Sequence, residues 1–132
     1  MRFILLLIAA TSTPALAAEQ YDLACQGTKI SKQGGPPEAN AFRVRIDLTG
    51  KKWCQDSCER ISDIYEIGAE QVVLADDVTY NSRTDLQNKV TVDRKTNAFH
   101  QLAGQDRPSP SYLKVEAACT EQPFTPFPKA GS

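Results

Sequence analysis

The chain has 132 residues, of which 15 are basic and 16 are acidic, and its formal net charge is −1. This balance excludes the basic footprint of a nucleic-acid-binding protein and strong electrostatic attraction to an anionic membrane. The length predicts one domain, built from a modest supply of apolar residues.

The first 17 residues, MRFILLLIAATSTPALA, have the layout of a cleaved secretory signal peptide. Arg2 is the positive n-region, Phe3–Ala10 is the apolar segment, and a small-residue cleavage site ends at Ala17. The apolar segment is too short to span a bilayer, and no later stretch is apolar enough to insert after cleavage. We therefore expect a periplasmic or secreted protein with one mature β domain over residues 18–122 and a Pro-rich extended tail over 123–132.

Four cysteines in a small exported chain predict disulfides rather than free thiols. Three pairings are possible, and the local patterns favour one of them. Tyr21–Cys25 and Leu113–Cys119 both alternate between apolar and polar positions, as half-buried strands do, and each carries its cysteine on the apolar face. A Cys25–Cys119 bond would join the first strand to the last.

The remaining pair, Cys54 and Cys58, lies in the segment KKWCQDSCER. One helical turn or a tight loop brings such positions within disulfide range. Redox enzymes use two intervening residues instead of three, and a metal site would need more ligands than His100, the single histidine, can add. We interpret the Cys54–Cys58 pair as a structural staple and expect no metal or cofactor.

Some elements between residues 29 and 88 have a clear sequence pattern, and others are ambiguous. Lys29–Glu38 contains Gly-Gly-Pro-Pro and predicts a loop, and Phe42–Thr49 alternates cleanly as a strand. Ile61–Ile67 fits either a short helical turn or a bulged strand. The segment QVVLA predicts a strand that ends in a turn at Asp76-Asp77, after which another can begin, and residues 81–88 predict a polar loop.

The later elements read as a hairpin followed by a final strand. Lys89–Asp93 and Ala98–Leu102 flank a turn in which Asn97 takes the left-handed conformation, and Ser111–Thr120 is the last strand. Together these patterns predict an all-β fold. The expected architecture is a small antiparallel β-barrel or sandwich of six to eight short strands, disulfide-bonded and with little helix.

The order IDLTGKKWCQDSC, QVVLAD, VTVDRKTNAF, a final strand with Cys119, and FTPFP resembles a group of small exported proteins of Gram-negative bacteria. That group shares an F-x-I-D-L segment before W-C-x₃-C, a V-D-R-x-T-G type of hairpin and a terminal C with F-x-x-F-P. Asn97 stands where glycine is usual in the group. The resemblance implies fold and compartment, and it brings no activity with it.

Trp53 is the first candidate for a binding residue, and two interpretations of it stay open. It can pack across the Cys54–Cys58 staple and close one end of a barrel. It can also project from a rigid loop as an anchor for a partner, with Lys51, Lys52 and Arg60 as a basic rim.

No residue is predicted to be catalytic. We interpret His100 as an ordinary strand residue and Asp76-Asp77 as a turn. Tyr80–Arg83 is interpreted as a polar loop, and because it contains an aromatic side chain it is a candidate contact surface. The sequence thus favours a non-catalytic binding module for an unknown protein or small ligand. The alternatives are a structural envelope component and, less favoured, a thiol redox or hydrolytic enzyme.

Overall fold

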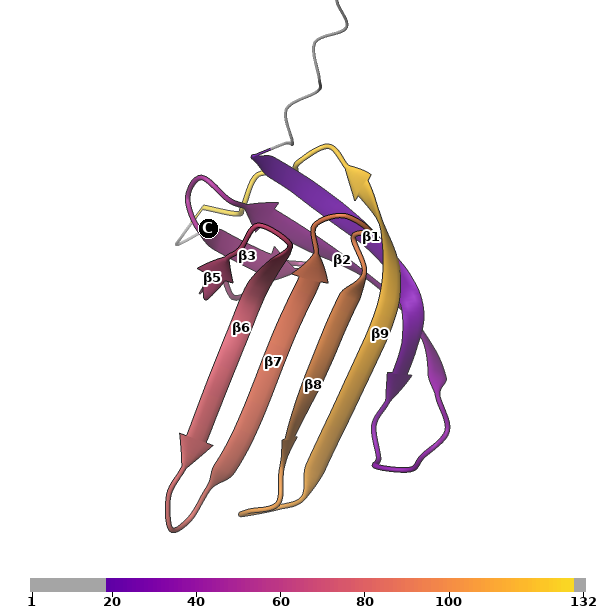
Figure 1. Ribbon diagram of the computed structural model, residues 1–132, viewed down its shortest axis with the longest axis vertical. Coiled ribbons are helices and arrows are strands. Elements are labelled where there is room, and N and C mark those ends of the chain that lie inside the picture. Colours follow the sequence, from indigo (N-terminus) through magenta and orange to yellow (C-terminus); the bar gives the residue numbers. More distant parts are fainter. Residues whose placement is uncertain (1–18, 130–132) are drawn as a thin grey trace, which may run out of the picture.

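The computed structural model describes residues 19–129, so the expected signal peptide at residues 1–17 and the last three tail residues lie outside it. The described residues form nine β-strands and no helix (Figure 1). The strands are β1 Gln20–Ile30, β2 Glu38–Asp47, β3 Lys52–Gln55, β4 Ser62–Asp63, β5 Glu66–Ile67, β6 Gln71–Tyr80, β7 Asp85–Asp93, β8 Phe99–Gln105 and β9 Ser111–Gln122. The predicted all-β class is confirmed, with two very short strands bringing the number above six to eight. The same residues contain no helix that could cross a membrane.

All nine strands belong to one antiparallel sheet with the order β4-β3-β2-β1-β9-β8-β7-β6-β5. The sheet curls into a half-barrel in which β6–β9 extend beyond the other strands (Figure 1). Between β4 and β5 the chain passes from one edge of the sheet to the other, since the N–H of Ile64 donates to Lys51 and that of Tyr65 to Leu74. The half-barrel is therefore bridged at this end, which we call the proximal end, and open at the distal end, where β6–β9 turn.

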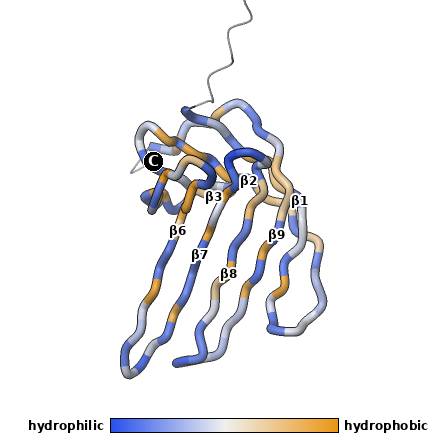
Figure 2. Tube along the Cα trace, in the orientation of Figure 1, coloured by the Kyte–Doolittle hydropathy of each residue, from blue (hydrophilic) through white to orange (hydrophobic). Residues whose placement is uncertain are grey.

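The core follows from strict alternation along the strands. Cross-strand pairs such as Val72 with Val92 and Phe99 with Ala117 place apolar side chains on one face. Figure 2 shows hydrophobic and hydrophilic positions alternating along β6–β9, with a hydrophilic turn between β6 and β7. The core comprises Tyr21, Leu23, Cys25, Phe42, Val44, Ile46, Leu48, Ile64, Val72, Leu74, Val90, Val92, Phe99, Val115 and Ala117.

Both predicted disulfides are confirmed. Cys25 and Cys119 lie directly opposite each other in the β1–β9 pair and are bonded across it. Cys54 and Cys58 are bonded across a tight loop that follows β3, which we call the staple loop. Two disulfides are compatible with an extracellular or periplasmic location.

The prediction that a strand ends in a turn at Asp76-Asp77 is wrong. The strand β6 runs through both residues to Tyr80, and Tyr80 still pairs with Asp85 of β7. A register shift between Val73 and Ala75 marks a β-bulge just before the acidic pair. This part of the sheet carries no apolar core. The two carboxylates can therefore stay in contact with water within the strand, and they do not have to end it. The polar loop shrinks accordingly to residues 81–84.

The ambiguous segment Ile61–Ile67 contains no helical turn. It forms the two-residue strands β4 and β5 around the buried side chain of Ile64. The predicted hairpin between β7 and β8 is confirmed, and the left-handed residue in its turn is Asn97, with φ 60°.

This turn yields a stability prediction. The N–H of Asn97 donates to the carbonyl of Asp93 at 2.8 Å, which holds the residue in the left-handed conformation. A β-branched side chain is strained there, so Asn97→Val is expected to lower the unfolding free energy by about 1–2 kcal/mol. Asn97→Gly is the control and is expected to stay within about 0.5 kcal/mol of wild type. Equal urea midpoints for the valine and glycine variants would contradict this account.

Candidate functional site

The staple loop is held rigidly by β2. The N–H of Asp56 donates to the Arg43 carbonyl at 2.8 Å, and the N–H of Arg43 donates back to the Asp56 carboxylate at 3.0 Å. Asp56 and Cys58 both have positive φ values, of 54° and 58°. The disulfide and the paired hydrogen bonds thus fix a shape that an open chain would rarely adopt.

Trp53 is neither fully packed as a barrel plug nor fully exposed as a partner anchor, the two interpretations that the sequence left open. It pairs with Ile46 across β2 and β3 and packs partly buried against the core. Its remaining surface lines a hollow of about 330 Å³ together with the staple loop. The indole Nε1 is buried and has no hydrogen-bond partner, a property that it shares with Arg45 Nε among the described residues.

The predicted basic rim is only partly assembled around Trp53. Arg60 lines the same hollow as the indole. Lys52 instead forms an ion pair with Asp63 of the neighbouring strand β4. Lys51 is exposed in the turn before β3 and does not line the hollow.

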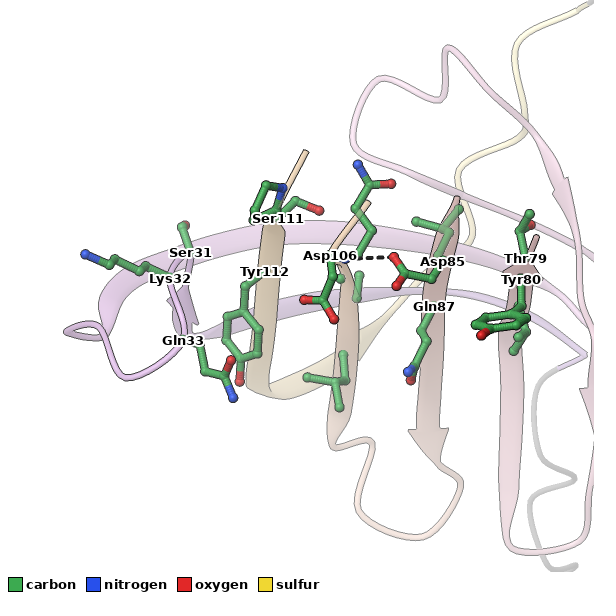
Figure 3. Close-up of a pocket in the computed structure, with 17 residues that line it drawn as sticks. Ser31, Lys32, Gln33, Thr79, Tyr80, Asp85, Gln87, Asp106, Ser111 and Tyr112 are labelled. Carbon is green, nitrogen blue, oxygen red and sulfur yellow. Dashed lines mark hydrogen bonds between the residues drawn. The ribbon is translucent and has the colours of Figure 1, made fainter. Parts of the chain in front are cut away.

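A larger hollow lies at the distal end, where sequence reasoning placed only a candidate contact at Tyr80–Arg83. It has a volume of about 630 Å³ and is lined by the ends of β6–β9 and by the loop between β1 and β2 (Figure 3). We call it the distal groove. Its lining residues are Ser31, Lys32, Gln33, Val78, Thr79, Tyr80, Asp85, Leu86, Gln87, Leu102, Ala103, Gly104, Gln105, Asp106, Pro110, Ser111 and Tyr112.

Strand register explains which side chains share the face of this groove. Val78, Gln87, Gly104 and Tyr112 form one cross-strand row, and Leu102 lies two residues from Gly104 on the same face. This face is opposite to that of the core residues. In Figure 3 the side chains of Tyr80, Gln87, Tyr112 and Gln33 project to the same side of the sheet.

The distal groove exposes large apolar side chains to water. Val78 is 72% exposed, Tyr80 81% and Leu102 49%. Gly104 has no side chain to fill the space between Gln87 and Tyr112, and a Cβ there would lie 3.0 Å from the Ser111 carbonyl oxygen. Apolar side chains gathered around a hollow, with amides and carboxylates nearby, are typical of binding surfaces.

The rim of the groove joins two turns through Asp85 and Arg107. Asp85 accepts hydrogen bonds from the N–H groups of Arg107 and Asp106, both at 2.8 Å, and these bonds hold the pKa of Asp85 below its ordinary value. The Arg107 guanidinium donates to the carbonyls of Asn81 and Ser82 and lies 5.6 Å from the ring centroid of Tyr80. The turns at the end of β6 and after β8 are therefore tied together around Tyr80.

The core-side face of the same strands carries a polar ladder instead. Asn88 donates to Asp77 at 3.4 Å, and Gln101 donates to Asn88 at 3.1 Å. This ladder marks where the apolar core stops. The two faces of distal β6–β9 thus differ, because the core side carries the hydrogen-bonded Asp77, Asn88 and Gln101, whereas the groove side carries the exposed Val78, Tyr80 and Leu102.

The residues considered for chemistry do not converge on either hollow. His100 is exposed on β8, opposite Thr91 and Glu116. Within residues 19–129, no three His, Cys, Asp or Glu side chains are grouped so that they could hold a metal ion, and every described cysteine is in a disulfide.

Sequence could have suggested the distal groove through one signal. Val78 and Tyr80 alternate with Thr79 directly after two acidic residues, a strand pattern with no role in the core. The partners Leu102, Gly104 and Tyr112 come from other strands and are placed beside them only by register. Comparison with protein-family models, with curated proteins and with solved structures finds no match to this chain.

Proposed function

We propose that the protein is an exported, non-catalytic binding module and that it holds its ligand in the distal groove. The observation that carries this proposal is the exposure of Val78, Tyr80 and Leu102 around one hollow of about 630 Å³. Exposed apolar side chains cost solubility, and grouped ones mark interaction sites more often than scattered ones do. The signal-peptide pattern and the two disulfides support a periplasmic or secreted location.

Two features favour the distal groove over the staple loop. The distal groove has nearly twice the volume of the hollow beside Trp53. Its apolar groups are also free to contact a ligand, whereas Trp53 already spends part of its surface on the core. Like the staple loop, the distal groove is also pre-organised, here by the contacts between Asp85 and Arg107 at its rim, and this reduces the entropy lost on binding.

A test uses small aromatic probes, because the ligand is unidentified. Isotope-labelled protein without residues 1–17 is titrated with a panel of one- and two-ring aromatic compounds, and amide shifts are mapped by NMR. We expect shifts concentrated at Val78, Leu102, Gly104 and Tyr112. Leu102→Ser is expected to weaken binding by about tenfold, because apolar contact area is lost.

The matched control is Ile61→Ser, which removes another exposed apolar side chain that does not line the groove. Its affinity for the probes is expected to equal that of wild type. Shifts confined to Trp53, Cys54 and Arg60 would instead assign binding to the staple loop. Absence of shifts at both hollows would favour the structural envelope component.

A further inference from the structure

The distal half of β6 is an open sheet edge. β5 pairs only with Val72 and Val73, and the last backbone contact on that side is the N–H of Tyr65 donating to Leu74. From Ala75 to Tyr80, β6 pairs with β7 on one side and with no backbone of residues 19–129 on the other. In Figure 1 the lower half of β6 forms the border of the sheet.

Native proteins rarely leave such an edge unprotected. Here the bulge at Val73–Ala75 and the carboxylates of Asp76 and Asp77 protect its beginning. The following three residues, Val78-Thr79-Tyr80, all favour extended conformation and include neither proline nor lysine. One half of the edge is therefore protected against strand pairing, and the other half is free to pair. Such an edge is suited to pairing with a specific partner strand.

The side chains along the edge determine which residue types the partner strand needs at each position. Val78 and Tyr80 project onto the face of the distal groove, whereas Asp77 projects onto the opposite face beside Asn88. A residue directly opposite each of them in an added strand lies on the same face and contacts it. An antiparallel partner would therefore present an apolar residue to Tyr80, another to Val78, and basic residues to Asp77 and Asp76.

We propose that the edge of β6 from Ala75 to Tyr80 binds an extended segment of a partner protein by antiparallel strand addition. The segment reads apolar-x-apolar-basic-basic from its N-terminus, and its two apolar side chains extend over Val78 and Tyr80 into the distal groove. This inference rests on the proposed function and names the occupant of that site. Backbone hydrogen bonds supply affinity in this mode, and the alternating side chains supply specificity.

Charge argues against a second copy of the chain as this occupant. Antiparallel pairing of two such edges over their whole length sets Asp77 opposite Val78 and Asp76 opposite Thr79 of the other copy. Four carboxylates would then lie along one short strand pair, where like charges repel. A basic partner strand removes that repulsion.

The test uses a synthetic capped peptide with the central sequence Tyr-Thr-Val-Lys-Arg, titrated into the labelled protein without residues 1–17. We expect amide shifts along Ala75–Tyr80 and at Leu102. Two N-methylated peptides separate strand pairing from loose contact, one methylated at Tyr, Val and Arg and the other at Thr and Lys. Only one edge of an added strand faces β6, so one set is expected to weaken binding by about tenfold or more and the other to leave it nearly unchanged.

A charge exchange tests the register. Asp77→Lys is expected to weaken binding of the original peptide, and replacing the peptide lysine by glutamate is expected to restore it. Glu70→Lys is the control, since it adds the same charge outside the open edge. The reversed peptide, Arg-Lys-Val-Thr-Tyr, is expected to bind more weakly because it can match these contacts only in a parallel orientation.

Three results would overturn the inference. The first is equal loss from both N-methylated sets, and the second is a shift pattern at the β2 edge around Glu38–Ala41 or at the staple loop. The third is failure of the peptide to bind while aromatic probes still shift Leu102 and Tyr112, which leaves the proposed binding groove intact. Failure of both the peptide and the aromatic probes would remove the proposed function together with the strand addition.

Discussion

Replacing Cys25 and Cys119 together by alanine is expected to lower the free energy of unfolding by about 4–5 kcal/mol. The bond closes a loop with a sequence separation of 94 residues, and without it the unfolded chain regains the conformational freedom of that whole loop. The bond also joins the first long strand to the last. The other disulfide lies within the staple loop and does not link these two strands. Urea unfolding of the wild type and the double variant, at one pH, measures the difference.

The staple loop supplies the matched control. Cys54 and Cys58 are separated by only four positions, so the same chain-entropy argument gives about 2 kcal/mol for the paired alanine variant. The stability loss is therefore expected to rank with loop length. An equal or larger loss for the Cys54/Cys58 variant would show that the tight loop around Trp53, rather than chain entropy, dominates the stability supplied by disulfides.

Asp22→Asn is expected to lower the free energy of unfolding by about 2–3 kcal/mol at neutral pH. The Asp22 side chain is fully buried, and it accepts hydrogen bonds from Arg43 Nε at 2.8 Å, Thr125 Oγ1 at 2.6 Å and Thr125 N at 3.0 Å. An asparagine amide would point a donor at one of these donors and would lose the ionic partner of Arg43. The half-exposed Arg43 keeps the effect below that of a fully buried ion pair.

Acid is expected to remove this contribution. Burial alone would raise the pKa of Asp22, but the hydrogen bonds from Thr125 and Arg43 outweigh it and hold the pKa below its ordinary value. A carboxyl whose pKa is lower in the folded state stabilises the fold above its unfolded pKa of about 4 and loses that contribution as the pH falls through the folded pKa. The stability difference between wild type and Asp22→Asn should therefore shrink between pH 7 and pH 3.

The same measurement on Asp106→Asn is the control, because that carboxylate is exposed at the distal rim. It is expected to change stability by less than about 0.5 kcal/mol at either pH. A pH-independent difference between wild type and Asp22→Asn would mean that the loss comes from packing rather than from the charged hydrogen bonds.

Local alternation made much of the fold predictable. Strands that contain core residues, such as Phe42–Leu48, Lys89–Asp93 and Leu113–Cys119, carry one apolar face and reveal it in the sequence. Cys25 and Cys119 each lie on the apolar face of such a strand, and this placement made their pairing predictable. Asn97 was recognisable because few side chains tolerate the left-handed position.

The distal part of the fold was not predictable in this way. The segment Asp76–Tyr80 has no core to face, so its strand is held by backbone pairing with β7 and its polar residues resemble a turn. The two-residue strands β4 and β5 depend on backbone contacts to Lys51 and Leu74, which lie outside the segment itself. The distal groove combines side chains from four strands, and only the register of the sheet decides which of them share a face.

The placement of the Cys25–Cys119 bond also decides how the protein responds to mechanical force. β1 and β9 run antiparallel, so tension applied at Gln20 and Gln122 peels their pairing apart one residue pair at a time. Only the pairs of Asp22, Leu23 and Ala24 with Gln122, Glu121 and Thr120 precede the disulfide. Tension would open those pairs and the Asp22–Thr125 contact and then stop at a covalent bond, so the part of β9 before Cys119, including the groove residues Ser111 and Tyr112, would stay unloaded.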